Sequence, residues 1–146
     1  RNYPIFLKIA PDLSEAEIGD TVASTLAHGL DGLIVSNTTL SREGLRSPLA
    51  AESGGMSGAP LFALATQALR YARAASEGRL TLIGAGGIAS GADAYAKIRA
   101  GASLVQLYSA MVYEGPGLAD AIRRDLTARL RADGFRSVSE AVGTAA

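Results

Sequence analysis

Four short apolar runs, each followed by a segment of helical period, constrain the fold of this chain more than any other feature. The runs are IFLKIA (5–10), GLIVSN (32–37), LTLIGA (80–85) and SLVQLY (103–108). They lack the strict alternation of a half-exposed strand, which is typical of parallel strands covered on both faces. Strand and helix therefore alternate along the chain, and this order predicts an α/β fold with parallel strands and right-handed crossovers.

The segments between the runs carry local signals of helices. Ser14 and Glu17 form a capping box at the start of the first helix, and Gly29 supplies a left-handed stop at its end. In the second helix, the period predicts four core side chains: Leu61, Leu64, Ala68 and Leu69. Two further helices are predicted over residues 90–101 and 118–134.

Two architectures accept this order, an open doubly wound sheet and a (β/α)8 TIM barrel. A complete barrel usually needs about 250 residues, so four βα units would supply half of one. On the barrel interpretation, residues 1–146 are the C-terminal half of a single barrel domain, with no second domain. The strands at 5–10 and 103–108 would then lack closing partners, and such open edges predict self-association.

Composition excludes several classes of function. The chain has 14 basic and 14 acidic side chains and no basic cluster of the kind that nucleic-acid binding requires, so no nucleic-acid partner is expected. With no cysteine and one histidine, His28, neither a disulfide framework nor a metal site is expected. No apolar run approaches the roughly 18 residues of a membrane span.

The stretch IGAGGIASGADA raises the question of a dinucleotide site, because Gly84, Gly86 and Ala89 fit the G-x-G-x-x-G/A fingerprint. That fold places an acidic residue about 20 residues further on, to bind the ribose. Here the neighbourhood is LVQLYSAM, and no acid follows until Glu114. Asp93, in the first turn of the next helix, would also compete with a pyrophosphate for the helix dipole. The loop therefore favours a single phosphate.

Polar residues and glycines follow the predicted strands. They are Ser36, Asn37 and Thr38 after the second strand, Gly86 and Gly87 after the third, and Tyr108 and Ser109 after the fourth. Carboxyl ends of parallel strands meet on one face, and barrels often bind a phosphate with the loops after their last two strands. Several of these residue types are also ordinary turn formers.

Two further features allow a functional and a structural interpretation. Lys8 interrupts an apolar strand, where it would either meet an anion or reduced cofactor ring, or protect an edge strand from aggregation. The long connection from Thr38 to Ala59 contains GGMSG (54–58), whose glycines would let backbone approach a ligand closely. The structural interpretation of this connection is a mobile loop on the surface.

Five collinear segments give the chain its family resemblance: KIAPDLSEAE (8–17), DGLIVSNTT (31–39), SGGMSGAPL (53–61), IGAGGIASGADA (83–94) and AGASLVQLYSA (100–110). Together they resemble the C-terminal half of class 2, quinone-dependent dihydroorotate dehydrogenases. The resemblance implies a (β/α)8 barrel that binds flavin mononucleotide (FMN) and oxidises dihydroorotate to orotate in pyrimidine synthesis.

The resemblance also implies roles for single residues. Lys8 would face the flavin ring, and Ser36, at a position commonly threonine in the family, would also touch the flavin. Asn37 and Thr38 would hydrogen-bond orotate. The remaining flavin contacts would be Gly58, Gly87, Tyr108 and Ser109, the last three on the phosphate.

In the family, the catalytic base is a serine in the N-terminal half of the barrel, and N-terminal helices form the quinone site and attach the enzyme to the inner (cytoplasmic) membrane. No catalytic residue is therefore expected within residues 1–146, which should be soluble and inactive alone. Two other functions stay open: another phosphate- or FMN-binding TIM-barrel enzyme, and a non-catalytic half-barrel remnant.

Overall fold

A sheet of four parallel strands, in the order β1-β2-β3-β4, forms the centre of the chain. The computed structural model describes residues 3–146. The strands are β1 (Phe6–Ile9), β2 (Gly32–Val35), β3 (Thr81–Ala85) and β4 (Leu104–Gln106). Each pairs in parallel with the next along the chain, which confirms the predicted topology. The apolar runs extend slightly beyond the paired residues.

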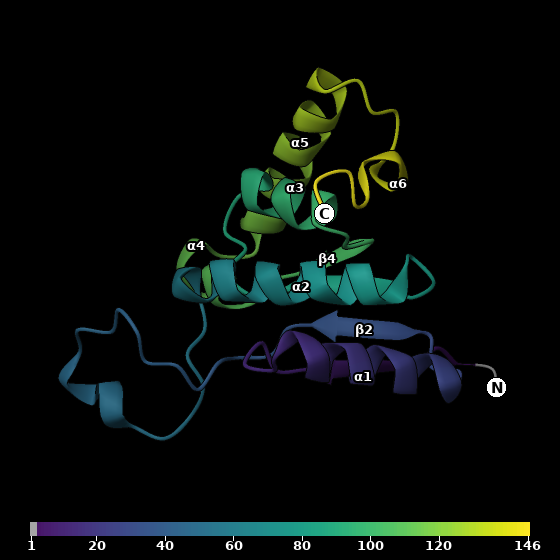
Figure 1. Cartoon of the computed structure of the whole chain (residues 1–146). Helices are drawn as coiled ribbons and strands as arrows, with labels where there is room; N and C mark the ends of the chain where they lie inside the picture. Colours follow the sequence, from purple (N-terminus) through teal and green to yellow (C-terminus); the bar gives the residue numbers. More distant parts are fainter. Residues whose placement is uncertain (1–2) are drawn as a thin grey trace.

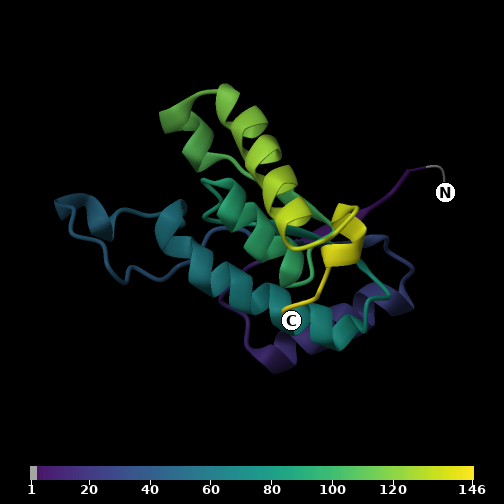
Figure 2. The ribbon, with the colours of Figure 1, turned by 90° about the horizontal axis from the view of Figure 1, so that it is seen from above.

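A long helix follows each of the first three strands, and three helices follow the fourth strand. The long helices are α1 (Glu15–Ala27), α2 (Phe62–Ser76), α3 (Gly91–Arg99) and α5 (Gly117–Ala132). Figures 1 and 2 show α1 beside α2 and α3 beside α5. Three short helices were not predicted: η1 (Pro48–Ala51), α4 (Ser109–Glu114) and α6 (Val138–Ala141). The first turn of the predicted second helix forms a separate 3-10 helix, η2 (Ala59–Leu61). Within residues 3–146, no helix has the length and hydrophobicity to cross a membrane.

The strand register separates the two faces of the sheet. One row of paired residues, Ile9, Val35, Gly84 and Val105, lies on the helix-covered face and is buried except for the partly buried Val105. The adjacent row, Lys8, Ile34, Ile83 and Leu104, lies on the other face and is partly or fully exposed. The sequence predicted strands covered on both faces, whereas the described residues cover only one.

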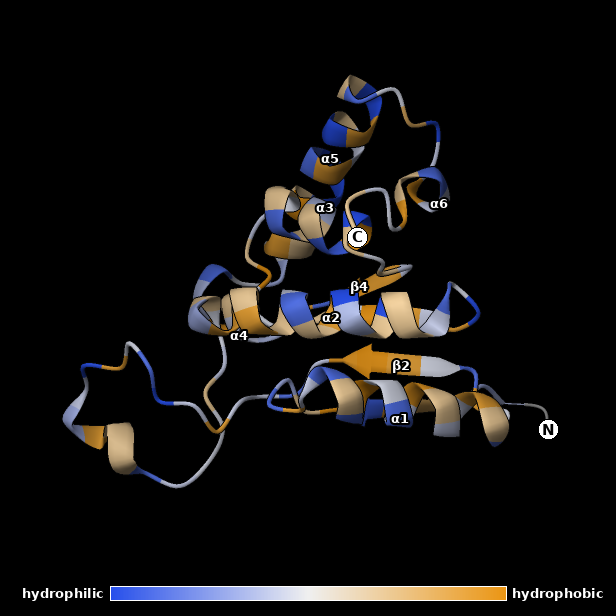
Figure 3. Ribbon diagram, in the orientation of Figure 1, coloured by the Kyte–Doolittle hydropathy of each residue, from blue (hydrophilic) through white to orange (hydrophobic). Residues whose placement is uncertain are grey.

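The core lies between the sheet and its helices. Leu33 and Val35 are fully buried there, and Figure 3 shows β2 as a hydrophobic strand beside helices of mixed character. The helices contribute apolar side chains to the same cluster, among them Ile18, Val22, Leu69 and Ile98. A parallel sheet covered by helices on one face, built from four βα units, is half of a (β/α)8 barrel.

The predicted helix ends of α1 are confirmed. The Ser14 hydroxyl accepts a hydrogen bond from the Glu17 N–H at 3.3 Å, and the Glu17 carboxylate accepts one from the Ser14 N–H at 2.8 Å. These bonds from Ser14 lower the pKa of the Glu17 carboxyl. At the other end, Gly29 has φ +62°, the left-handed conformation expected after a helix.

One predicted core residue of α2 is wrong. Leu61 and Leu69 are buried, with exposed fractions of 2% and 0%, but Leu64 is 39% exposed. Leu64 lies at the margin of the apolar stripe, since the buried residues of the helix centre on Ala65, Leu69 and Ala72.

This difference gives a matched test of the core. We expect L69A to lower the free energy of unfolding by about 2–5 kcal/mol, because it leaves a cavity in a packed interior. L64A, on the same helix, should cost less than about 1 kcal/mol. Urea denaturation of both variants measures the difference, and equal losses would contradict this assignment of the core.

Candidate functional site

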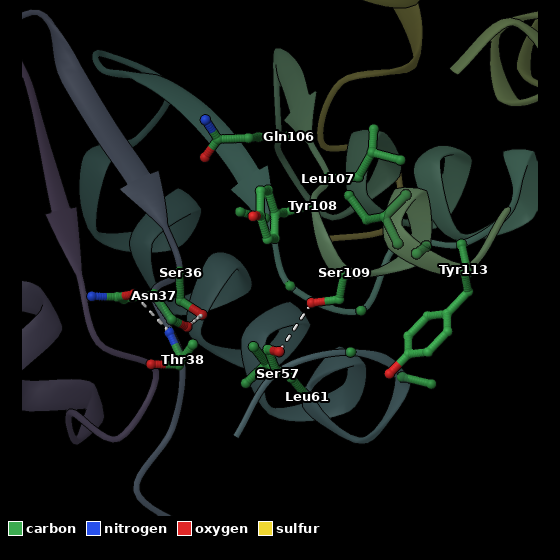
Figure 4. Close-up of a pocket in the computed structure, with 18 of the residues that line it drawn as sticks. Ser36, Asn37, Thr38, Ser57, Leu61, Gln106, Leu107, Tyr108, Ser109 and Tyr113 are labelled. Atoms are coloured by element: carbon green, nitrogen blue, oxygen red, sulfur yellow. Dashed lines mark hydrogen bonds between the residues drawn. The ribbon is translucent and has the colours of Figure 1, made fainter. Parts of the chain in front are cut away.

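A pocket of about 710 Å³ lies at the carboxyl ends of the four strands. Figure 4 shows polar side chains from several elements around it. Its wall includes every site residue predicted from the sequence: Lys8, Ser36, Asn37, Thr38, Gly58, Gly87, Tyr108 and Ser109. The structure therefore brings these residues together, while the role of each stays a prediction.

The residues after β2 join three strands at the pocket. The N–H of Ser36 donates to the Ala85 carbonyl at 3.3 Å, and the N–H of Asn37 donates to the Ile9 carbonyl at 2.8 Å. The Asn37 side-chain oxygen accepts the N–H of Thr38 at 2.9 Å, as Figure 4 shows. Among residues 3–146, the Asn37 side-chain NH₂ group has no acceptor, so it is available to a ligand.

The turn after β3 presents backbone donors to the pocket. Gly86 and Gly87 have φ of +96° and +75°, and a Cβ on Gly87 would lie 2.5 Å from the Cβ of Phe62. Only glycine fits there. In the described part of the chain, neither glycine N–H donates to a protein acceptor. Two adjacent unpaired N–H groups in left-handed backbone suit an anion such as a phosphate.

The N-terminus of α3 is already occupied by its own side chains. The Asp93 carboxylate accepts the Ala89 N–H at 3.1 Å and the Ser90 hydroxyl at 2.8 Å, and the Ser90 oxygen accepts the Asp93 N–H at 3.1 Å. A pyrophosphate would have to displace this carboxylate, whereas a single phosphate can use the preceding glycine donors. This geometry supports the sequence argument against a dinucleotide.

The residues after β4 meet the glycine-rich loop across the pocket. The Ser109 hydroxyl donates to the Ser57 hydroxyl at 2.9 Å, as Figure 4 shows. Ser109 begins α4, a short helix at the position where phosphate-binding barrels carry an extra helix. Tyr108, directly before it, is 81% exposed.

Sequence reasoning missed several polar residues of the wall, among them Ser57 and Gln106. Ser57 carried no signal beyond its place in GGMSG, because its partner Ser109 is distant in sequence. Gln106 could have been found, since strand alternation places it on the same face as Leu104 and the open row of the sheet.

Charge on the pocket wall is sparse. Within the described chain, Lys8 and Glu114 are its only charged side chains. Lys8 is exposed and stands on β1, an edge strand of this sheet. The structure thus places it at both positions that the sequence left open, an edge strand and a ligand pocket.

The long loop after β2 extends from the body of the molecule in Figures 1 and 2 but is tied at its base. Thr39 and Met56 exchange two backbone hydrogen bonds, at 3.1 and 2.8 Å. The Thr39 side chain is buried and donates to the Asp12 carboxylate. These contacts position Ser57 and Gly58, which directly follow Met56, at the pocket.

One side chain organises the rest of this loop. The Arg42 guanidinium donates to five backbone carbonyls, those of Leu40, Ser41, Ala50, Glu52 and Gly54. These bonds give the loop an internal structure that a mobile surface excursion would lack, while its contact with a ligand stays a prediction.

A buried lysine lies behind the pocket, and sequence reasoning missed it. The Lys97 side chain of α3 is 0% exposed. Its Nζ lies 3.4 Å from the Ala85 carbonyl oxygen and 4.9 Å from the centre of the Phe62 ring. Burial and, to a smaller extent, the charge of Arg70 lower its pKa to about 7 against the opposing charge of Asp93. The sequence carried no signal of this burial, because a lysine in such a helix would ordinarily be assigned to solvent.

A parallel sheet covered by helices on one face, a pocket at its carboxyl ends and a short helix after the last strand define the class of fold: half of a (β/α)8 barrel. A family model described as Dihydroorotate dehydrogenase matches residues 1–130. The chain belongs to the dihydroorotate dehydrogenase family.

The relatives are named as quinone-dependent enzymes. The dihydroorotate dehydrogenase (quinone) of Cereibacter sphaeroides is 59% identical over 144 residues, covering 99% of this chain and 41% of that protein. The mitochondrial one of Arabidopsis thaliana is 54% identical over 142 residues, covering 96% of this chain and 31% of its own length. The chain therefore spans less than half the length of these relatives.

A solved structure agrees with the fold. The dihydroorotate dehydrogenase of Eimeria tenella, in complex with ferulenol, superposes with a TM-score of 0.90 at 45% identity. The match covers 94% of this chain and 37% of that one.

The loop gives one prediction. We expect R42M to raise the rate of subtilisin cleavage within residues 38–59 by about tenfold, because five carbonyls lose their donor and the loop opens more often. The control is R46M in the same loop, where Arg46 is exposed and has no hydrogen bond within residues 3–146. We call the five Arg42 hydrogen bonds the Arg42 clamp. Equal rates of cleavage of R42M and wild type would contradict its role in holding the loop.

The buried Lys97 gives a second prediction, on the pH dependence of stability. Its folded pKa of about 7 lies below the ordinary 10.5, so between these values the unfolded chain binds more protons and stability rises with pH. From pH 7 to 9 the free energy of unfolding should rise by about 2 kcal/mol more in wild type than in K97M. K8M, which removes the exposed lysine, should keep the wild-type slope. Parallel pH profiles of wild type and K97M would count against the shift.

Proposed function

We propose that this chain forms the FMN-phosphate and orotate site of a quinone-dependent dihydroorotate dehydrogenase. The observation that carries the proposal is the pair of unpaired N–H groups at Gly86 and Gly87, on one pocket wall with the polar ends of the other strands. Membership of the family and the names of the relatives support the substrate and the acceptor.

The residues present fit a flavin mononucleotide. The glycine donors, with Ser109 and Tyr108, would bind the phosphate at the ends of β3 and β4. Gly58 would let the loop backbone approach the cofactor, since nothing but Pro60, at 4.0 Å, lies near the position of a Cβ there. Ser36, at the end of β2, would contact the ring system.

Bound flavin supplies hydride acceptance. Lys8, on the open face of β1, would place a positive charge beside the flavin and stabilise negative charge there. Asn37 donates its free side-chain NH₂ group to the substrate, and Thr38 adds a hydroxyl beside it. The substrate is thereby oriented at the carboxyl ends of β1 and β2.

We assign no catalytic base to residues 1–146, because the family resemblance places the catalytic serine in the N-terminal half of the barrel. Quinone binding and attachment to the inner membrane are likewise assigned to no residue of this chain. The exposed row of the sheet and the open edges of β1 and β4 would be covered by further protein, or by a second copy in self-association.

The experiment is to purify the full-length protein and measure its flavin and its activity. We expect bound flavin that absorbs at about 450 nm, and reduction of a quinone-like dye that depends on dihydroorotate. Residues 1–146 alone should show no such reduction, with intact mass confirming the sample. An active but colourless enzyme would indicate a barrel enzyme that does not use flavin. Bound flavin without turnover of dihydroorotate would indicate another oxidoreductase. Absence of both flavin and activity would indicate a non-catalytic half-barrel.

A single variant tests the substrate contact. N37A should lower kcat/KM for dihydroorotate by about 10–100-fold, the cost of losing hydrogen bonds to a charged ligand, while flavin content stays unchanged. Q67A, an exposed amide on α2, should behave as wild type. Loss of flavin in N37A, or unchanged kcat/KM, would remove Asn37 from the substrate site.

A further inference from the structure

Lys97 is the only charged side chain that residues 3–146 bury completely. It makes no ion pair in this part of the chain; its contacts are the Ala85 carbonyl and the Phe62 ring. Burying an ammonium group in such surroundings is costly, so a protein gains nothing from it unless the charge does something that an apolar side chain could not.

The position of the charge suggests what it does. The Ala85 carbonyl that faces Lys97 belongs to the same peptide unit as the N–H of Gly86. In a trans peptide, the C=O and the N–H lie on opposite edges of one plane. Lys97 therefore stands at one end of a peptide dipole, and an unpaired N–H of a pocket-lining glycine stands at the other.

A cation at the carbonyl oxygen polarises the peptide and makes its N–H a stronger donor. The same oxygen also accepts the N–H of Ser36, at 3.3 Å, so the unit joins the ends of β2 and β3. Phe62, under the Lys97 ammonium, is the residue against which Gly87 packs. Lys97 thus contacts both groups that hold the turn at Gly86 and Gly87 in place, the Ala85 carbonyl and the Phe62 ring.

The other charges around Lys97 are few. Arg70 on α2 disfavours its protonation and Asp93 on α3 favours it. β3 contributes no ionisable side chain, because its residues are Thr81–Ala85. An anion bound at the glycine turn would add a second favourable charge.

We infer that Lys97 is a buried positioning residue of the phosphate site, which acts through the Ala85–Gly86 peptide to strengthen binding of the phosphate dianion without touching it. This inference rests on the proposed function. It separates Lys97 from the residues that contact the ligand and gives the site a source of positive charge inside the protein.

Binding of a phosphate dianion should be coupled to protonation of Lys97. A bound dianion raises the pKa of Lys97 above its free value of about 7, so binding near pH 8 takes up protons. Affinity for the phosphate ligand must then fall as pH rises from 7 to 9. A phosphate monoester has its second pKa near about 6, so the ligand is already mostly a dianion over this range.

The experiment compares FMN with riboflavin, which lacks the phosphate, on flavin-free full-length protein. For wild type we expect FMN binding to weaken between pH 7 and 9 while riboflavin binding does not. Calorimetry at pH 8 in two buffers of different ionisation enthalpy should show proton uptake with FMN only. These measurements need no variant.

The variants then locate the effect. At pH 7, K97M should weaken FMN binding about tenfold and riboflavin binding less than about twofold, because only the phosphate interacts with the lost charge at long range. K97M should also lose the proton uptake. K97R keeps the charge but does not titrate, so its FMN affinity should stay near wild type and be independent of pH from 7 to 9.

The outcomes separate the two proposals. If wild type binds neither flavin, the proposed function fails and the inference falls with it. If wild type binds FMN but shows no proton uptake, or the same pH dependence for riboflavin, the inference is overturned while the proposed function stands. A K97M variant that weakens both flavins equally would reduce Lys97 to structural support and overturn it as well.

Discussion

Parallel pairing of the strands determines where everything else in this chain can lie. Because β1 to β4 run in one direction, their four carboxyl ends meet at one edge, and the residues after β2, β3 and β4 face a common space with Lys8 of β1. The register also divides the side chains into a buried row and an open row. The pocket, its glycine turn and the lysine behind it all follow from these two consequences.

Much of the fold could be predicted because its signals are local. Apolar runs, the Ser14–Glu17 box and Gly29 each act within a few residues, and the structure confirms them. The site residues could be gathered because polar residues at strand ends share an edge whatever the helices do. Leu64 was misplaced because a period of 3.6 leaves the margin of a stripe undecided.

What could not be predicted depends on contacts between distant segments. The Ser57–Ser109 bond joins two loops, and the Arg42 clamp needs a loop path that no local pattern specifies. The peptide bond between Val35 and Ser36 is cis, and the sequence carries no proline there to indicate it. Lys97 appears in a helix whose charged residues would ordinarily be assigned to solvent, and only tertiary packing buries it.

The Arg42 clamp limits how the loop after β2 can change in length. Its acceptors are the carbonyls of residues 40 and 41 and of residues 50, 52 and 54. The guanidinium therefore joins two segments of the loop and fixes the distance between them. Residues 43–49 lie between these groups and are exposed. Insertions and deletions are therefore tolerable at 43–49, where chain length is free, whereas one residue added at 50–54 would shift every later carbonyl away from its donor. The tip of the loop can diverge freely while its closing segment keeps one length.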